Sequence, residues 1–390
     1  MHVGLSLLFQ RLGEESDAEV YQTEMALAVR AEDDGFDSVW TPEHHFSDHG
    51  VTPQVPQFLS WIAGQTKHIK LGSMVMVLPW HDPIRVSESF TLLDHLSEGR
   101  SILGIGRGLG RSEFEAFRIP MAESRRRFTE YTPAILESLE TGYIEADGEL
   151  YKQPRIAIRP APLKSFRGRT FASAVSPQSI DLVAKLGVGL MIIPQKPWHI
   201  VEEELAGYAK RFREVTGEEA PKPVLAVNVA IGETEAEAEE MYEKYLMGMS
   251  RSTSEHYEFQ NKNLANIEGY EYYGALANNI EKHGIDKFNR FLADLQICGT
   301  AEQVTAKLMD YVDRIDAGAV LAILTFGGMS RETAFANQER FVKHVLPALK
   351  AHDVGGDIGV RHAPGHFENR AAGGDAPDKD DNGLTVPTAF

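Results

Sequence analysis

Short apolar runs alternate with longer amphipathic stretches over most of the chain. The apolar runs predict eight buried strands, at 3–8, 37–40, 69–78, 101–106, 169–174, 189–193, 224–230 and 319–326. Apolar residues spaced three or four apart follow each run and predict helices at 17–34, 53–66, 85–97, 124–141, 177–186, 199–215, from about 234, and at 331–349. Eight such units predict an α/β fold, a closed (β/α)₈ TIM barrel over residues 1–350. A doubly wound open sheet is the alternative, because periodicity does not separate the two.

Three segments interrupt this rhythm and predict insertions. Residues 107–123 form a connection rich in Gly and Arg after the fourth strand, and residues 143–168 contain an Asp-Gly turn signal. Residues 245–295 are polar and aromatic, and we expect them to form a lid over the barrel mouth, since long insertions in compact domains are usually functional. Residues 353–390 are rich in glycine and acidic residues and predict a disordered C-terminal tail.

Composition narrows the class of protein. The chain has 390 residues, with 39 Lys and Arg against 57 Asp and Glu, so its formal net charge is −18. This balance argues against nucleic-acid binding and against a polybasic membrane-surface role, because both need clustered cations. The single cysteine, Cys298, excludes an internal disulfide and a cysteine zinc site. The N-terminus lacks signal-peptide features and the longest apolar runs are too short to span a bilayer, so we expect a cytoplasmic protein.

Two adjacent histidines, His44 and His45, follow the second predicted strand, where a barrel would place its active site. Adjacent side chains project in different directions and no HxH or HxxxH spacing accompanies them, so we expect no metal. Two interpretations stay open. Both histidines pack locally under a loop, or one of them is an acid/base group, since imidazole titrates near neutral pH.

A glycine-rich loop with an arginine follows the fourth predicted strand. Its sequence is Gly104-Ile-Gly106-Arg107-Gly108-Leu-Gly110-Arg111. Glycines leave backbone N–H groups open to an anion and an arginine adds a bidentate fork, so the loop is typical of a phosphate cradle, although a packing turn has the same composition. It matches neither the dinucleotide fingerprint nor a P-loop.

A serine-rich helix start follows the fifth predicted strand. Ser176 is a natural N-cap, Pro177 suits the first helical position, and Ser179 falls at the third. Both hydroxyls then stand at the positive end of a helix, a ready anion site, although an ordinary capped helix looks the same. Strands four and five are neighbours in a barrel, so this helix start and Arg107 could hold one phosphate. With a histidine across the mouth, FMN is the first candidate cofactor.

Four motifs, in this order and spacing, resemble the bacterial luciferase-like flavin-dependent monooxygenases. They are EHHF at 43–46, LGSMVMVLPWHDPIRVSE at 71–88, LLDHLSEGRSILGIGRG at 92–108 and SAVSPQS at 173–179. The resemblance implies a (β/α)₈ barrel that uses reduced FMN supplied by a separate NAD(P)H-dependent flavin reductase. It also implies that the reduced flavin reacts with O₂ to form a C4a-hydroperoxide, which oxygenates an apolar or partly apolar small molecule.

The resemblance also implies roles for individual residues. His44 matches the family's active-site histidine, Arg107 grips the FMN phosphate with Ser176 and Ser179 beside it, and a non-prolyl cis peptide joins Met74 to Val75. Two positions depart from the light-emitting members. Gly106 stands where their catalytic subunit has a reactive cysteine, and Val175 stands where they have a glutamate. These changes argue against light emission, and we expect Gly106 to leave room at the flavin edge.

Further expectations concern the pocket, the partners and the alternatives. The aromatic residues Trp40, Phe46, Trp80 and Trp198 lie near strand ends and could line an apolar pocket, or belong to the core. We expect a homodimer, with helices 52–66 and 85–97 as interface material. An F420-dependent oxidoreductase of the same fold and a non-catalytic flavin-binding homologue are the alternative functions.

Overall fold

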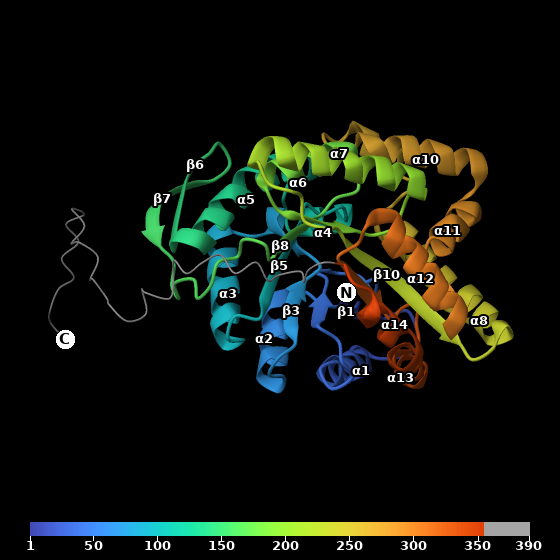
Figure 1. Cartoon of the computed structure of the whole chain (residues 1–390). Helices are drawn as coiled ribbons and strands as arrows, with labels where there is room; N and C mark the ends of the chain where they lie inside the picture. Colours follow the sequence, from blue (N-terminus) through green and yellow to red (C-terminus); the bar gives the residue numbers. More distant parts are fainter. Residues whose placement is uncertain (355–390) are drawn as a thin grey trace.

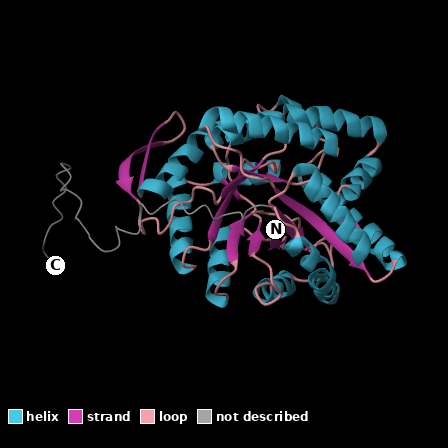
Figure 2. Ribbon diagram, in the orientation of Figure 1, coloured by secondary structure: helices cyan, strands magenta, loops and turns pink. Residues whose placement is uncertain are grey.

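The computed structural model describes residues 1–354 and contains a closed barrel of eight parallel strands surrounded by helices (Figures 1 and 2). Its strands are β1 (His2–Ser6), β2 (Ser38–Thr41), β3 (Lys70–Ser73), β5 (Ser101–Gly106), β8 (Thr170–Ser173), β9 (Gly189–Ile192), β10 (Val224–Gly232) and β12 (Ala319–Ile323). β10 pairs with both β9 and β12, and β12 pairs with β1, so the sheet closes on itself. The predicted TIM barrel is confirmed, and the open sheet is wrong.

The outer ring consists of amphipathic helices that cover the strands. They are α1 (Asp17–Arg30), α2 (Val55–Gln65), α3 (Pro83–Leu96), α5 (Ser124–Thr141), α6 (Pro177–Leu186), α7 (Trp198–Thr216), α8 (Glu235–Met241), α12 (Ala301–Ile315), α13 (Arg331–Arg340) and α14 (Leu346–Ala351). All nine residues of β10 are buried, as expected of a strand covered on both faces. Within residues 1–354, no helix is both long and apolar enough to cross a membrane.

Two local features depart from the predicted elements. The strand expected at 69–78 is split into β3 and β4 (Met76–Val77) by a cis peptide between Met74 and Val75. Residues 297–318, to which the sequence pattern assigned no element, form β11 (Ile297–Thr300) beside β10, followed by α12. The start of α12 is a capping box between Thr300 and Gln303, a signal that is visible in the sequence.

The three insertions each have regular structure. Residues 107–123 include α4 (Arg111–Ala116), and residues 143–168 contain the antiparallel hairpin of β6 (Tyr143–Asp147) and β7 (Lys152–Ala157), which projects at one side of the barrel (Figure 1). The insertion at 245–295 is largely helical, with α9 (Met247–His256), α10 (Glu271–His283) and α11 (Ile285–Asp294). The predicted tail, 353–390, lies almost wholly outside the described residues.

The insertion packs on the 107–123 connection through an apolar cluster of its own. Phe114 and Met121 of the connection are buried against residues of the insertion, which include Phe259, Leu264, Tyr270, Tyr273, Ile280 and Leu292. Burial of this many large side chains fixes one segment against the other. The insertion is therefore joined to the loop that follows β5.

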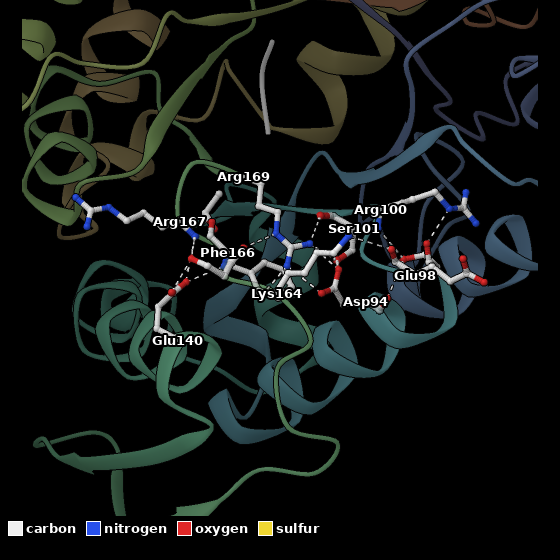
Figure 3. Close-up of polar contacts among 12 residues, drawn as sticks. Asp94, Glu98, Arg100, Ser101, Glu140, Lys164, Phe166, Arg167 and Arg169 are labelled. Carbon is white, nitrogen blue, oxygen red and sulfur yellow. Dashed lines mark hydrogen bonds and ion pairs between the residues drawn. The ribbon is translucent and has the colours of Figure 1, made fainter. Parts of the chain in front are cut away.

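A buried ion pair joins β5 and β8 at their N-terminal ends (Figure 3). Arg169, which directly precedes β8, donates to both carboxylate oxygens of Asp94 on α3, at 2.5 and 2.9 Å. Ser101, the first residue of β5, donates its hydroxyl to Asp94 at 2.7 Å, and its carbonyl accepts from Arg169 at 2.9 Å. Asp94 is 0% exposed, so this pair works in a low dielectric and has its remaining polar atoms satisfied.

We expect Asp94→Ala to lower the free energy of unfolding by about 3–5 kcal/mol, because it leaves the buried Arg169 guanidinium without a counter-charge. Denaturant unfolding followed by circular dichroism measures the loss. The control is Asp181→Ala, which removes half-exposed pairs with Lys185 and Arg211 and should cost less than about 1 kcal/mol. Equal losses in the two variants would contradict a special role of the buried pair.

Candidate functional site

The structure brings all eight predicted site residues to one cavity at the C-terminal rim of the barrel. The cavity is lined by His44, Met74, Val75, Gly106, Arg107, Val175, Ser176 and Ser179. It holds about 1080 Å³ of space, the open mouth included. These residues follow β2, β3, β5 and β8, whose carboxyl ends meet at one rim because the strands are parallel. The peptide between Met74 and Val75 is cis, as the family resemblance implied.

One end of the cavity is cationic. Arg107 and Arg125 both line it, and both donate to the carbonyl oxygen of Gly269 in the insertion, at 2.8 and 3.3 Å. Burial and the nearby Arg107 guanidinium lower the pKa of Arg125. Within residues 1–354, neither arginine has a carboxylate within ion-pair distance, in contrast to Arg126 and Arg127. Two guanidinium groups without a carboxylate partner form a site suited to an anion such as a phosphate.

The N-terminus of α6 lies at the same end. Ser176 is its N-cap and accepts from the Ser179 backbone N–H at 3.3 Å, while their hydroxyl oxygens are 2.9 Å apart. Lys196 donates to the Val175 carbonyl and pairs with Glu204, which holds the loop before the helix. The positive end of the helix adds to the two guanidinium groups in favouring an anion here.

The other end of the cavity carries a cluster of two imidazoles around one carboxylate. Glu113 on α4 is 1% exposed, and its Oε1 lies 3.3 Å from His44 Nδ1 while its Oε2 lies 3.4 Å from His256 Nε2. Burial opposes ionisation of Glu113, but contacts with His256 and His44 outweigh it and lower its pKa to about 2. An ionised carboxylate only accepts, so His44 presents its Nδ1–H to Glu113. Its Nε2 faces the Tyr257 hydroxyl at 3.5 Å.

The adjacent histidines of the EHHF motif have different surroundings. His44 lines the cavity, whereas His45 is buried and its Nε2 contacts Glu43 Oε1 at 3.1 Å. Glu43 also contacts His81 at 2.5 Å and accepts from the Val77 backbone N–H at 2.7 Å. His45 therefore belongs to a network that supports the loops under the cavity, and of the two only His44 is placed for acid/base chemistry.

His44, Glu113 and His256 also offer a possible set of metal ligands. One ligand atom from each lies within 4.8 Å of the others. The sequence spacing did not reveal this group, because His256 comes from the distant insertion and Glu113 from the connection after β5. Imidazole and carboxylate ligands suit Zn²⁺ and similar ions. The expectation that no metal is bound remains a prediction.

The room expected at Gly106 is wrong, and the two interpretations of the aromatic residues, pocket lining or core, are decided residue by residue. A Cβ at Gly106 would lie 2.3 Å from Val75 Cγ2, so the neighbouring valine already fills the space that Gly106 was expected to leave open. Of the four aromatic residues proposed as lining, only Trp80 contacts the cavity. Trp40 is fully buried in the barrel, and Phe46 is 67% exposed.

Trp198 does not line the cavity and packs against Tyr311, with ring centroids 4.2 Å apart and the ring planes tilted by 49°. Sequence reasoning missed four residues that the structure adds to the site, namely Arg125, Glu113, His256 and Tyr257. A run of three arginines at 125–127 was the one local signal for the first of them.

A closed parallel barrel with a cationic pocket and an imidazole at its C-terminal rim defines an enzyme of the TIM-barrel class. The chain belongs to the luciferase-like monooxygenase family, whose family model matches residues 1–317. A relative with an assigned activity is the alkanal monooxygenase alpha chain of Photobacterium leiognathi. It is 27% identical over 351 residues, which cover 86% of this chain and 95% of that one.

Solved structures share the fold over nearly the whole described barrel. A monooxygenase of Streptomyces bottropensis matches with a TM-score of 0.72 at 22% identity, covering 90% of this chain and 100% of that one. The oxygenating constituent of 3,6-diketocamphane monooxygenase of Pseudomonas putida, solved with FMN, has a TM-score of 0.67 at 18% identity over 89% and 98% of the chains. An F420-dependent secondary alcohol dehydrogenase has a TM-score of 0.66 at 15% identity over 90% and 99%.

With FMN as a phosphate-bearing probe, we expect Arg107→Ala and Arg125→Ala each to weaken binding by roughly 10- to 100-fold, because each removes a charge-assisted contact worth about 1.5–3 kcal/mol. Quenching of flavin fluorescence on titration measures the affinity. Arg126→Ala is the matched control, since Arg126 is adjacent on α5 but pairs with the exposed Glu149. Unchanged affinity in both cavity variants would place the phosphate elsewhere.

Proposed function

We propose that the protein is the oxygenase component of a two-component FMN-dependent monooxygenase, which uses reduced FMN and O₂ to oxygenate an apolar or partly apolar small molecule. The observation that carries the proposal is the convergence of Arg107, Arg125 and Ser176 at one end of a cavity that has His44 at the other. Membership of the luciferase-like monooxygenase family supports it. A separate NAD(P)H-dependent flavin reductase would supply the reduced cofactor.

The residues of the cavity fit FMN. The guanidinium groups of Arg107 and Arg125 and the N-terminus of α6 would hold the phosphate, and Met74 and Val75 would lie beside the ring system. When bound, reduced FMN supplies the two electrons with which one atom of O₂ enters the substrate and the other becomes water.

The residues of this chain would bind, orient and shield the reactants. Glu113 accepts from His44 Nδ1 and so leaves Nε2 to accept or donate a proton in the cavity. Tyr257, a half-buried residue of the insertion, lies 3.5 Å from that Nε2 with its hydroxyl and lines this side of the cavity. Exclusion of water and of stray proton donors protects a reactive reduced cofactor, which is the role we propose for the insertion as a lid.

F420-dependent hydride transfer is the second candidate, because a solved structure of the same fold has that cofactor. A non-catalytic flavin-binding homologue is the third. Oxygen uptake with FMN, NADH and a flavin reductase, scored against a panel of small organic substrates by product formation, tests the first. Turnover with reduced F420 and no O₂ uptake would favour the second, and FMN binding without turnover of either cofactor would favour the third.

We also propose that the protein is a cytoplasmic homodimer that pairs through α2 and α3. These helices are in contact, and they expose large apolar side chains at Trp61, Leu92 and Leu96. Neighbouring exposed apolar residues are typical of a protein–protein interface.

We expect His44→Ala to lower oxygenation of a productive substrate by about 100-fold or more while FMN affinity stays within about twofold, because a general acid/base typically contributes about 10²- to 10⁴-fold. The reductase-coupled assay and the fluorescence titration measure the two quantities. His68→Ala, at an exposed position, is the control. Full activity of His44→Ala would remove the acid/base role.

We expect Glu113→Gln to lower turnover by about tenfold or more, because the neutral amide no longer holds His44 by a charge-assisted hydrogen bond. The pKa of Glu113, about 2, lies far below the working range, so the carboxylate stays ionised and the loss should be the same at pH 6 and pH 8. Glu115→Gln, two residues along α4 and exposed, is the control. A loss that disappears at pH 6 would show that Glu113 is protonated there.

A further inference from the structure

Glu113 lies between two imidazoles that come from distant parts of the chain. We call the group of His44, Glu113 and His256 the rim cluster. His44 follows β2, Glu113 is on α4, and His256 ends α9 in the insertion. The side chains of Glu113 and His256 are 1% and 3% exposed, and that of His44 is 14% exposed. His44 and Glu113 line the cavity, which gives an ion a route to the cluster.

The distances in the rim cluster are longer than those usual for hydrogen-bonded ion pairs. Glu113 turns one carboxylate oxygen towards each imidazole, at 3.3 Å from His44 Nδ1 and 3.4 Å from His256 Nε2. Charge-assisted hydrogen bonds from nitrogen to a carboxylate are about 2.7–2.9 Å long. Two ligands that each lie about 2.1 Å from one tetrahedral ion are instead about 3.4 Å apart. The observed spacing therefore matches that of ligands around a metal ion.

His256 adds a second observation, because its Nε2 makes no hydrogen bond within residues 1–354. This nitrogen is located by its distance to Glu113, so it lies on the side of the ring that faces the carboxylate. His49 stacks on the same ring, with centroids 4.5 Å apart, and holds its plane. Buried polar atoms nearly always have a partner, and a bound ion is one reason for an exception.

The outer contacts of the rim cluster are those expected of metal ligands. A metal-bound imidazole usually donates its second ring nitrogen to an oxygen, and a metal-bound carboxylate is hydrogen-bonded as well. His44 Nε2 lies 3.5 Å from the Tyr257 hydroxyl, and His256 Nδ1 lies 3.1 Å from the Ser47 hydroxyl oxygen. The carboxylate of the cluster accepts from the His45 backbone N–H at 2.8 Å. Each of the three side chains thus has a partner behind it that holds it towards the common centre.

We propose that the rim cluster is an inhibitory site for a divalent transition-metal ion, for which Zn²⁺ is the best-suited ion. His44 Nδ1, the Glu113 carboxylate and His256 Nε2 would bind it, with water from the cavity as a further ligand. Two imidazoles and one carboxylate form the ligand set of open zinc sites. The two ring nitrogens lie within 4.8 Å of each other, so the rings approach by up to about 1.4 Å on binding. The ion is a reversible ligand, and the expectation of no resident metal stands beside it.

The inhibitory effect rests on the proposed function, in which His44 is the acid/base group. An ion on Nδ1 requires the tautomer of His44 that carries its proton on Nε2, so one proton leaves Nδ1 for solvent and one is taken up at Nε2. That nitrogen then only donates, towards the Tyr257 hydroxyl, and no longer accepts a proton in the cavity. The cationic end is at the other end of the cavity, so flavin binding there should persist.

Calorimetric titration of the full-length protein with ZnCl₂, after dialysis against EDTA, tests the site without any cofactor. We expect one saturable site whose affinity falls at least about 10- to 100-fold in His256→Ala and in Glu113→Gln, since even the loss of an outer partner of a metal ligand has that effect. His283→Ala, exposed on α10 of the same insertion, and Glu115→Gln, exposed on α4, are the matched controls and should leave the affinity unchanged.

Two outcomes of the titration would overturn the proposal. The first, which needs no variant, is an unmodified protein without a saturable Zn²⁺ site. The second is a site that both folded ligand variants retain, which would show adventitious binding only. Circular dichroism establishes that the variants are folded.

The inhibitory role has its own test in the reductase-coupled assay. Zn²⁺ at saturation of the site should abolish oxygenation, EDTA should restore it, and FMN affinity should stay within about twofold. NADH oxidation by the flavin reductase alone, at the same Zn²⁺ concentration, is the control. Full turnover with the site saturated would overturn the inhibitory role. Absence of FMN-dependent turnover at any Zn²⁺ concentration, with the metal site present, would instead overturn the proposed function.

Discussion

The buried pair of Asp94 and Arg169 fixes the relation between β5 and β8 at the end of the barrel opposite the site. Ser101 joins the same network, so both strands are tied to α3 where they begin. Parallel strands that start in register also end as neighbours. The loop that carries Arg107 and the helix start at Ser176 are therefore adjacent, and the cationic end of the cavity depends on a contact at the far face of the barrel.

The insertion completes both ends of the cavity. Gly269 lies between the two arginines at the cationic end, while His256 and Tyr257 stand against the Glu113 and His44 pair at the other. Its apolar cluster fastens it to the connection after β5. The barrel alone would leave the guanidinium groups and the imidazole open to water, so the chemistry belongs to the barrel and the insertion together.

The sequence predicts the barrel and the core of the site because both follow from local signals. Periodicity gives the eight strands, and the parallel rule then places His44, Arg107 and Ser176 at one rim. The remaining contacts of the site depend on tertiary packing. Glu113 and His256 meet only when the insertion folds over α4, and the Val75 side chain fills the space at Gly106 once β3 and β5 lie side by side. Neither arrangement leaves a signature in spacing or composition.

The carbonyl of Gly269 has a consequence for how the cationic end is assembled. Gly269 has φ +85°, and a Cβ there would lie 2.6 Å from Arg107 Nη1, so a glycine suits this turn. One oxygen with partial negative charge receives hydrogen bonds from two like-charged groups that would otherwise repel each other. The two guanidinium groups are thus already oriented towards one point in the folded chain, where the Gly269 carbonyl oxygen accepts from both.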